Sequence, residues 1–235
     1  MILLNTVAVW LPIFAIFFIS LILKNLDEKK FFIFRTLLFI STFISGIVKQ
    51  IYAILTGYQL WYLPLHFSST FYVSVALSIF APPKVKRWAN AVLFIGGTIM
   101  LAMILFAPNA ILGDLTKIFS SPITFHGYFY HIIVIFQYFL IIAKREYHAR
   151  NYDFLIFCTF VLTWAIIAVP FAFKFNANYM GIIKPFIPFF QRLLQYYGYP
   201  VYLLTYFLCV YTISFFITIS YKKVCNLRPK KATLP

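Results

Sequence analysis

Acidic residues are scarce in this chain, whose 235 residues include five Asp and Glu against 20 Lys and Arg. Charged residues make up only 11% of the sequence, whereas soluble domains carry about 25%. This composition excludes a soluble globular domain. It also argues against a Ser-His-Asp triad, because Asp114 is the one acidic residue expected on the side that carries the candidate histidines.

Cysteine is scarce as well, with three residues in the chain. Cys158 and Cys209 lie in apolar runs, where a thiol behaves as a small hydrophobic group, and Cys225 lies near the basic C-terminus. No pair has the spacing of a disulfide or of a metal site. We therefore expect no disulfide, no metal and no cofactor.

Hydrophobic residues, by contrast, account for 63% of the chain, and the mean hydropathy is +0.90. A helix needs about 20 apolar residues to cross about 30 Å of hydrocarbon. Seven runs meet or approach this length, which predicts an all-α membrane protein: a bundle of seven transmembrane helices in one domain, residues 1–221, followed by a basic cytoplasmic tail, residues 222–235. The predicted spans are residues 2–23, 31–48, 63–81, 91–107, 127–143, 154–173 and 200–220. No basic residue precedes the first run, so we expect a retained helix and not a cleaved signal peptide.

The basic residues are distributed unevenly between the two sides of this bundle. Fourteen lie in loops one, three and five and in the tail, and five lie in the other loops. The fourteen are Lys24, Lys29, Lys30, Lys84, Lys86, Arg87, Lys144, Arg145, Arg150, Lys222, Lys223, Arg228, Lys230 and Lys231. The positive-inside rule then predicts an outside N-terminus and a cytoplasmic C-terminus in the cell membrane. Arg35, just inside the second run, is expected to snorkel toward the first loop.

The net charge of +15 follows from the same clusters of basic residues. Short basic clusters between apolar runs are what anionic lipid headgroups select. A basic stripe of the kind that enters a nucleic-acid groove is not seen. Membrane lipids are therefore the expected partners, and nucleic acid is not.

Histidines mark the outer ends of two predicted spans. His66 opens the third span, and His126 and His131 open the fifth. Ionisable groups at membrane depth usually face the bundle interior or a water-filled cavity. His126 alone also fits a headgroup anchor, whereas His131 lies five residues further in, about 7.5 Å deeper. Loop six adds Asn178, Tyr179, Lys184, Lys174 and Arg192 on the same side.

Other polar residues in the spans are expected to pack helices together. Thr70, Ser74 and Ser78 repeat every four residues in the third span, and Ser41 and Ser45 do so in the second. Small residues at this spacing let helix backbones approach closely in lipid. Gln137, a lone amide near the middle of the fifth span, is expected to hydrogen-bond to another helix.

Four short motifs, in order from the third span to the C-terminus, resemble those of the YwaF-like integral membrane proteins. They are Leu63-Pro64-Leu65-His66 with Ser68-Ser69, His126 with His131, Asn178-Tyr179-Met180 with Lys184-Pro185, and Tyr199-Pro200-Val201-Tyr202. Distant eukaryotic relatives of that family are described as phospholipid acyltransferases in which a cysteine carries the acyl group. The resemblance implies that Ser68 occupies the position of that cysteine.

The leading functional prediction is a phospholipid acyltransferase or hydrolase with a polar pocket in the outer leaflet. The rival prediction is a non-enzymatic carrier or sensor that binds a small polar solute in the same pocket, and a structural role is the third. In the enzyme, His131 or His66 acts as general base, Ser68 or Ser69 as nucleophile and Asn178 as oxyanion donor. Lys184, Lys174 and Arg192 hold the lipid phosphate, and His126 and Tyr179 contact the substrate.

Overall fold

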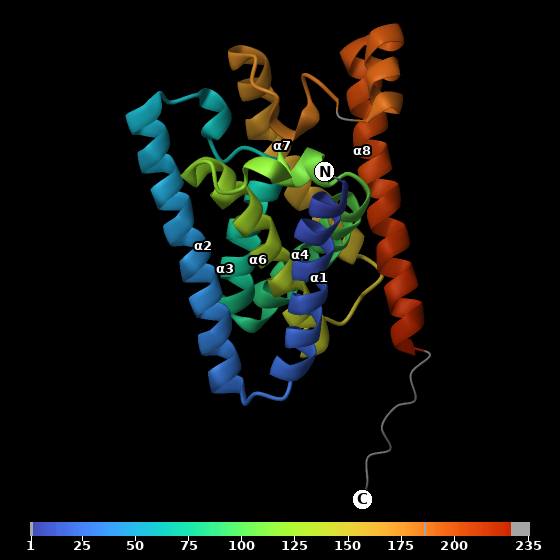
Figure 1. The fold of residues 1–235 in the computed structure, drawn as a ribbon. Coiled ribbons are helices and arrows are strands. Elements are labelled where there is room, and N and C mark those ends of the chain that lie inside the picture. Colours follow the sequence, from blue (N-terminus) through green and yellow to red (C-terminus); the bar gives the residue numbers. More distant parts are fainter. Residues whose placement is uncertain (1, 186, 227–235) are drawn as a thin grey trace, which may run out of the picture.

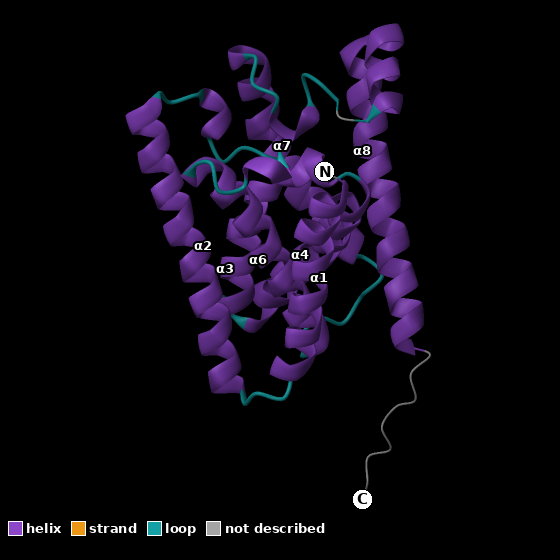
Figure 2. Cartoon of the chain, in the orientation of Figure 1, coloured by secondary structure: helices purple, strands orange, loops and turns teal. Residues whose placement is uncertain are grey.

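The computed structural model describes residues 2–185 and 187–226, and every regular element among them is a helix (Figure 2). The α-helices are α1 (Ile2–Leu23), α2 (Glu28–Thr56), α3 (Thr70–Phe80), α4 (Pro83–Phe106), α5 (Pro108–Leu112), α6 (Pro122–Ala143), α7 (Asp153–Phe175) and α8 (Pro188–Asn226). Four 3-10 turns interrupt the connections: η1 (Leu60–Tyr62), η2 (Phe67–Ser69), η3 (Leu115–Lys117) and η4 (Tyr179–Gly181).

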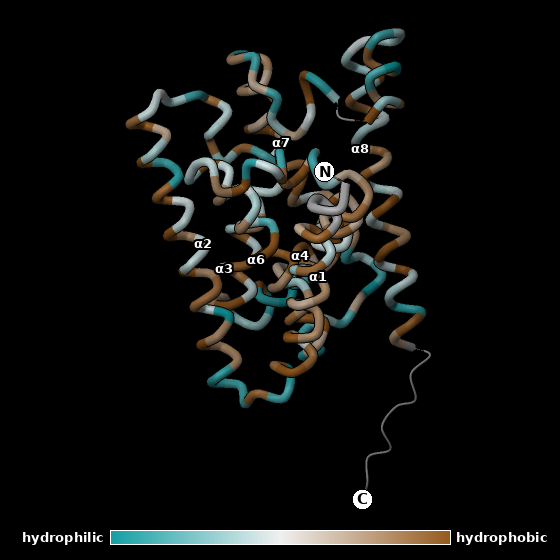
Figure 3. The backbone as a smooth tube through the Cα atoms, in the orientation of Figure 1, coloured by the Kyte–Doolittle hydropathy of each residue, from teal (hydrophilic) through white to brown (hydrophobic). Residues whose placement is uncertain are grey.

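Within the described residues, six helical segments are long and apolar enough to cross a membrane. Five of them contain α2, α4, α6, α7 and α8, and the sixth, Leu60–Phe80, combines η1, η2 and α3. The first helix, α1, has 22 residues, and its stretch Val7–Leu23 is apolar. Hydrophobic residues predominate along the helices, and hydrophilic residues are concentrated toward the two ends of the bundle (Figure 3). The chain therefore has the architecture of a multi-pass membrane protein.

The core lies around α4 and α6, which are the most buried of the six spans. Leu93 and Ile95 of α4 and Ile135 and Leu140 of α6 have no exposed surface. By contrast, α2 and α8 are the least buried, and they lie on opposite sides of the bundle (Figure 1). Their exposed apolar side chains therefore face lipid and leave the interior to α3, α4, α6 and α7.

Several predicted span boundaries differ from those of the helices. The second prediction, 31–48, is too short, because Asp27 caps α2 by accepting from the Lys30 amide and the helix runs on to Thr56. The fourth and fifth start earlier than predicted, since proline at the first helical turn begins both α4 and α6. The sixth prediction, 154–173, lies within two residues of the bounds of α7 at both ends.

The third predicted span, 63–81, overlaps the membrane-crossing segment Leu60–Phe80, but its first half is not α-helical. His66 has extended backbone angles (φ −67°, ψ 152°), η2 follows it, and α3 begins only at Thr70. Pro64 contributes to this break, because a proline disfavours α-helical geometry in the residue before it. His66 thus lies in a loop and not on a helix face.

The last predicted span, 200–220, corresponds to the much longer α8. The helix begins at Pro188 and bends at Gly198, whose φ of 75° is favourable only for glycine. It continues to Asn226, so the start of the predicted tail is helical, while the tail residues 227–235 lie outside the described residues.

The connections define two ends of the bundle. The histidine end carries the loops 57–69, 107–121 and 176–185, and the ion-pair end carries the loops 24–27, 81–82 and 144–152 (Figure 1). Between them, Thr70, Ser74 and Ser78 are buried on α3, which packs closely against α4. This confirms the predicted packing role of these small residues.

Candidate functional site

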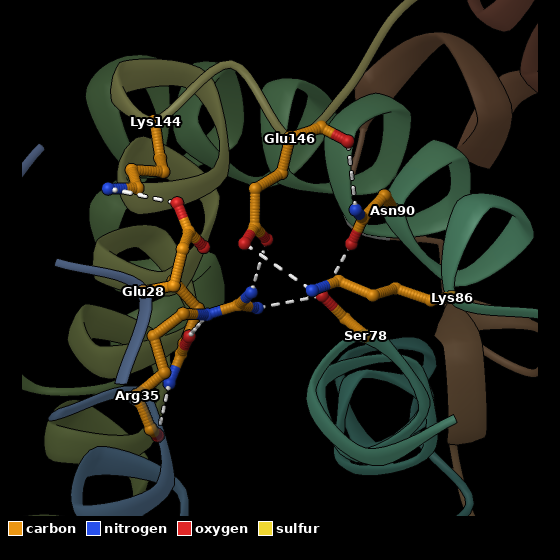
Figure 4. A network of polar contacts seen from close by, with 8 residues as sticks. Glu28, Arg35, Ser78, Lys86, Asn90, Lys144 and Glu146 are labelled. Atoms are coloured by element: carbon orange, nitrogen blue, oxygen red, sulfur yellow. Dashed lines mark hydrogen bonds and ion pairs between the residues drawn. The ribbon is translucent and has the colours of Figure 1, made fainter. Parts of the chain in front are cut away.

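Arg35 lies at the centre of the ion-pair end, where it is buried with 2% of its side chain exposed. Its Nε donates to Gln137 Oε1 at 2.8 Å, Nη1 to Glu146 Oε2 at 2.6 Å and Nη2 to Ser78 Oγ at 2.7 Å (Figure 4). The prediction that Arg35 snorkels is wrong, because acceptors from α3, α6 and the α6–α7 loop meet its guanidinium inside the bundle.

The partners of Arg35 are themselves fully engaged. Gln137 Nε2 donates to the Arg35 carbonyl at 3.0 Å, which confirms the predicted helix–helix hydrogen bond. Ser78 Oγ donates to Asn90 Oδ1, and Asn90 Nδ2 donates to the Glu146 carbonyl at 3.1 Å. Lys86 adds an ion pair with Glu146 at 3.4 Å (Figure 4). The network joins four helices to one loop.

A second carboxylate at this end is just as completely paired. Asp153 is fully buried and accepts from Arg87 Nη1 at 2.9 Å, from the Arg150 amide at 2.9 Å and from the Tyr147 hydroxyl at 3.0 Å. Burial first, and then the Asp153 carboxylate, raise the pKa of Tyr147, so the phenol stays a neutral donor. The groups at the ion-pair end therefore stabilise one another.

His126, on α6, is the best connected histidine at the other end. Its Nδ1 lies 2.8 Å from Ser45 Oγ on α2, and its Nε2 lies 3.2 Å from the Tyr72 hydroxyl on α3. The ring also stacks on Tyr130. With 7% exposure, His126 is not the headgroup anchor that the sequence alone suggested, because all of its polar atoms point into the bundle.

His131, one turn deeper on α6, has one engaged nitrogen. Its Nδ1 lies 2.5 Å from the Gly127 carbonyl oxygen. A carbonyl can only accept, so this contact assigns the ring proton to Nδ1 and leaves a lone pair on Nε2. No hydrogen bond to Nε2 exists within the described residues. His131 therefore presents a free basic nitrogen.

His66, in the α2–α3 connection, shows the same pattern with the nitrogens exchanged. Nε2 donates to the Trp61 carbonyl at 3.1 Å, and Nδ1 has no partner in the described part of the chain. Its ring packs at centroid distances of 4.1 Å from Trp61 and 5.3 Å from Tyr179. Tyr179 is fully buried and donates its hydroxyl to the Leu60 carbonyl, so it ties the α7–α8 loop to the α2–α3 loop.

These histidines share one electrostatic environment with Lys49 of α2. The Lys49 charge acts on His66, His126 and His131, and His131 interacts with each of the other two. Lys49 Nζ itself donates to the Tyr62 carbonyl at 3.3 Å. The structure thus brings together the three histidines that the sequence singled out, and adds a lysine that it did not.

The remaining candidates surround this cluster at varied distances. Ser68 and Ser69 are half-buried, and neither hydroxyl has a hydrogen-bond partner in the described residues. Asn178 contacts no histidine: its Oδ1 accepts from the Lys184 amide and its Nδ2 donates to the Lys184 carbonyl, both at 2.8 Å. The basic side chains further out are exposed and have no acidic partner among the described residues. They are Lys174, Lys184 and Arg192.

Sequence reasoning missed Ser45, Tyr72 and Tyr130 as members of the site. Ser45 was assigned to helix packing alone, and its position one turn before Lys49 was the available signal of a polar site on α2. Tyr130 donates to the Ser68 carbonyl at 2.5 Å and stacks on Tyr72 at 4.6 Å. Within residues 2–185 and 187–226, no group of three His, Cys, Asp or Glu is placed to hold a metal ion.

No curated protein and no solved structure matches this chain. Residues 1–219 match the TMEM164 family, a family of membrane proteins. The match covers most of the chain and agrees with the six membrane-crossing segments. The chain is a multi-pass membrane protein that belongs to the TMEM164 family.

Proposed function

We propose that this protein is a membrane enzyme that transfers or hydrolyses the fatty acyl esters of phospholipids at its histidine end. The observation that carries the proposal is the cluster of His66, His126 and His131, in which the first and last each keep one nitrogen without a partner. The resemblance to YwaF-like proteins and their acyltransferase relatives supports the same chemistry.

Acyl transfer needs a base that removes a proton from the attacking group, and a positioned base accelerates such steps by about 10²–10⁴-fold. In this proposal His131 Nε2 or His66 Nδ1 is that base. Ser68 or Ser69 attacks the ester directly, or His131 activates a water or an acceptor lipid. Asn178 keeps one amide hydrogen beyond the Lys184 contact and serves as the oxyanion donor.

Phospholipid binding also needs positive charge for the phosphate. Lys174, Lys184 and Arg192 are exposed near the loops of the histidine end, and Lys49 lies closer to the histidines. None of the four has an acidic partner among the described residues, so their charge is available to an anionic headgroup.

A solute carrier is less well supported. The internal cavity at the histidine end has a volume of about 10 Å³, about the space of one water. Its polar lining comes from Thr42, Tyr72, Tyr130 and Gln137. A polar metabolite would need a larger chamber than this cavity provides, and the larger groove between α2 and α6, of about 410 Å³, is lined mainly by apolar side chains.

The proposal places the histidine end in the outer leaflet of the cell membrane, with seven spans, an outside N-terminus and a cytoplasmic C-terminus. Single cysteines introduced as Thr56→Cys and Asn109→Cys should react with an impermeant thiol reagent added to intact cells. Cys225 should react only after the membrane is opened. Labelling of Cys225 together with either introduced cysteine in intact cells would contradict the seven-span topology.

The activity is tested by comparing phospholipid acyl chains in cells that express the protein or lack it. We expect the protein to shift acyl composition, and we expect His131→Gln to abolish that shift. His148→Gln is the matched control, since His148 is exposed at the ion-pair end. An unchanged acyl composition would refute the enzyme.

The same assay tests the serine that the family resemblance identified. If Ser68 carries the acyl group, Ser68→Ala should abolish the shift and Ser68→Cys should keep or raise it, because a thiolate is the better nucleophile. Full activity in Ser68→Ala would show that another group attacks the ester.

A further inference from the structure

A groove runs along the lipid-facing surface where α2 meets α6, close to the best connected histidine. It has a volume of about 410 Å³, within the ~300–1,000 Å³ of typical ligand pockets. Its walls are apolar, with Ile44 and Val48 from α2 and Phe125 and Phe129 from α6. The polar groups in the lining are the hydroxyls of Ser41 and Ser45.

We propose that Ser45 and His126 form a nucleophile–base pair that acts on the ester of a lipid whose acyl chain lies in this groove. The proposal rests on the acyl-transfer function argued above, and it assigns the nucleophile and base to Ser45 and His126 in place of Ser68 or Ser69 with His131 or His66. The geometry favours Ser45 over Ser68, because Ser45 Oγ lies 2.8 Å from His126 Nδ1, whereas the Ser68 hydroxyl has no imidazole within hydrogen-bond distance.

The Ser45 hydroxyl has two acceptors, the Thr42 carbonyl at 2.9 Å and His126 Nδ1 at 2.8 Å, and the tautomer of His126 with its proton on Nε2 is the one that lets Ser45 donate to Nδ1. The Tyr72 hydroxyl has the Thr42 carbonyl as an acceptor at 3.5 Å, so it can accept from His126 Nε2–H at 3.2 Å. Nδ1 then carries the lone pair and accepts the Ser45 proton at 2.8 Å. Tyr72 thus takes the orienting position that a carboxylate holds in a catalytic triad.

Gly46 makes this contact between helices possible. A Cβ at this position would lie 2.9 Å from the Tyr72 hydroxyl and 3.5 Å from His126 Cε1. Glycine in the middle of a helix costs about 1 kcal/mol relative to alanine. Its place beside Ser45 is explained by the close approach of both rings to the α2 backbone.

An acyl chain is the occupant that fits this groove best. The groove faces the region that lipid chains fill, and its lining has no charged side chain. Lys49 lies one helical turn beyond Ser45, about 6 Å along α2. A phospholipid with its phosphate near Lys49 therefore has its ester linkage near Ser45 and its chain between Ile44 and Phe125.

The chemical step is balanced by the groups present. Ser45 Oγ attacks the ester carbonyl carbon, and its proton passes to His126 Nδ1. The tetrahedral intermediate collapses with cleavage of the ester C–O bond, and the departing glycerol oxygen takes the proton from His126. An acceptor alcohol or water then attacks the acyl-serine in the same way and restores the Ser45 hydroxyl.

A long-chain alkyl fluorophosphonate is the direct probe, because a base-activated serine displaces fluoride from its phosphorus. We expect the intact protein in lipid nanodiscs to form an adduct on Ser45, located by peptide mass spectrometry. Ser41 provides the internal comparison. It lines the same groove one turn away, but its hydroxyl donates only to the Leu38 carbonyl, so it should stay unlabelled.

Substitutions separate base activation from simple access to the groove. His126→Gln should reduce the rate of Ser45 labelling at least 100-fold, and Tyr72→Phe should reduce it less while leaving the fold intact. Thr56→Ala is the control, because Thr56 is exposed and bonded only to the Tyr52 carbonyl. Each variant is first checked for an unchanged unfolding temperature.

Absent labelling of Ser45, equal labelling of Ser41, or labelling of Ser45 at an unchanged rate in folded His126→Gln would each overturn the pair. These outcomes are distinct from failure of the proposed function. A lipid shift in cells that survives Ser45→Ala would retain the enzyme and reject Ser45. Specific labelling of Ser45 without any lipid shift would retain the pair and reject phospholipids as its natural substrates.

Discussion

The two ends of this bundle use buried polar groups in opposite ways. At the ion-pair end, Arg35 and Asp153 are surrounded by partners that satisfy every charge (Figure 4). At the histidine end, His66 and His131 each keep a nitrogen without a partner in the described residues. Both ends are costly to bury in a membrane, yet only the second leaves capacity for a ligand.

This difference shows how intramembrane polar residues can be sorted by their contacts. A buried charged residue with partners from several helices contributes to the stability of the fold, because removing any partner leaves another group unpaired. A buried basic nitrogen without a partner makes no such contribution to stability. Substitutions at the ion-pair end should therefore affect mainly the stability of the protein, and substitutions of the histidines should affect mainly its activity.

The largest expected effect is on Arg35. Arg35→Met should lower the free energy of unfolding by about 3–5 kcal/mol, because Glu146, Gln137 and Ser78 lose a buried partner together. Titration with a denaturing detergent measures the change. Lys86→Met is the matched control and should cost less than about 1 kcal/mol, since Lys86 is 35% exposed and pairs only with Glu146. Equal losses in both variants would contradict a central role for Arg35.

An intermediate effect is expected from glycines at the histidine end. Gly46→Ala should destabilise the protein by about 1–3 kcal/mol, because the new methyl displaces the Tyr72 hydroxyl. Gly127→Ala should be neutral or stabilising by up to about 1 kcal/mol, since its Cβ would meet nothing within 4 Å. Thermal unfolding of the pair gives the comparison. Similar melting temperatures would mean that the contact between α2 and Tyr72 is loose.

The smallest effect should come from Tyr179→Phe, which removes the hydroxyl that donates to the Leu60 carbonyl. One hydrogen bond contributes about 0.5–1.5 kcal/mol, and the aromatic contact with His66 remains. Global stability should change little, while amide hydrogen exchange in residues 57–66 should accelerate. Unaltered exchange there would show that the ring alone holds the two loops together.

The sequence predicted the helices better than their contacts. Apolar length identified the regions of all the described α-helices except the short α5, and the amide of Gln137 was correctly expected to bond between helices. The α3 boundary was missed because four of the five residues of Leu63–Phe67 are apolar, and hydropathy does not distinguish an apolar helix from an apolar loop. The bend of α8 at Gly198 was not predicted, because helix lies on both sides of this glycine.

The site was predicted in part for a related reason. His66 and His131 stand out because ionisable residues are rare in apolar runs. Ser45 does not stand out, because serine is common where helices pack. Its meaning depends on His126, 81 residues away, and no local pattern predicts that pairing. Arg35 was misassigned for the same reason, since its carboxylate partner belongs to a distant loop.

The separation between Arg35 and Glu146 also has a consequence during synthesis. The two residues are 111 positions apart, and ribosomes add roughly 5–20 residues per second, so α2 waits about 6–22 s for its counter-charge. An unpaired arginine costs up to about 2.5–3.5 kcal/mol at the centre of a spanning helix, and Arg35 lies about two turns from the start of α2. We expect the nascent α2 to insert less deeply into the membrane, with the Arg35 guanidinium among the lipid headgroups, until α6 and the loop after it have been synthesised. The speed of translation through residues 36–146 therefore sets how long this helix is exposed to quality control.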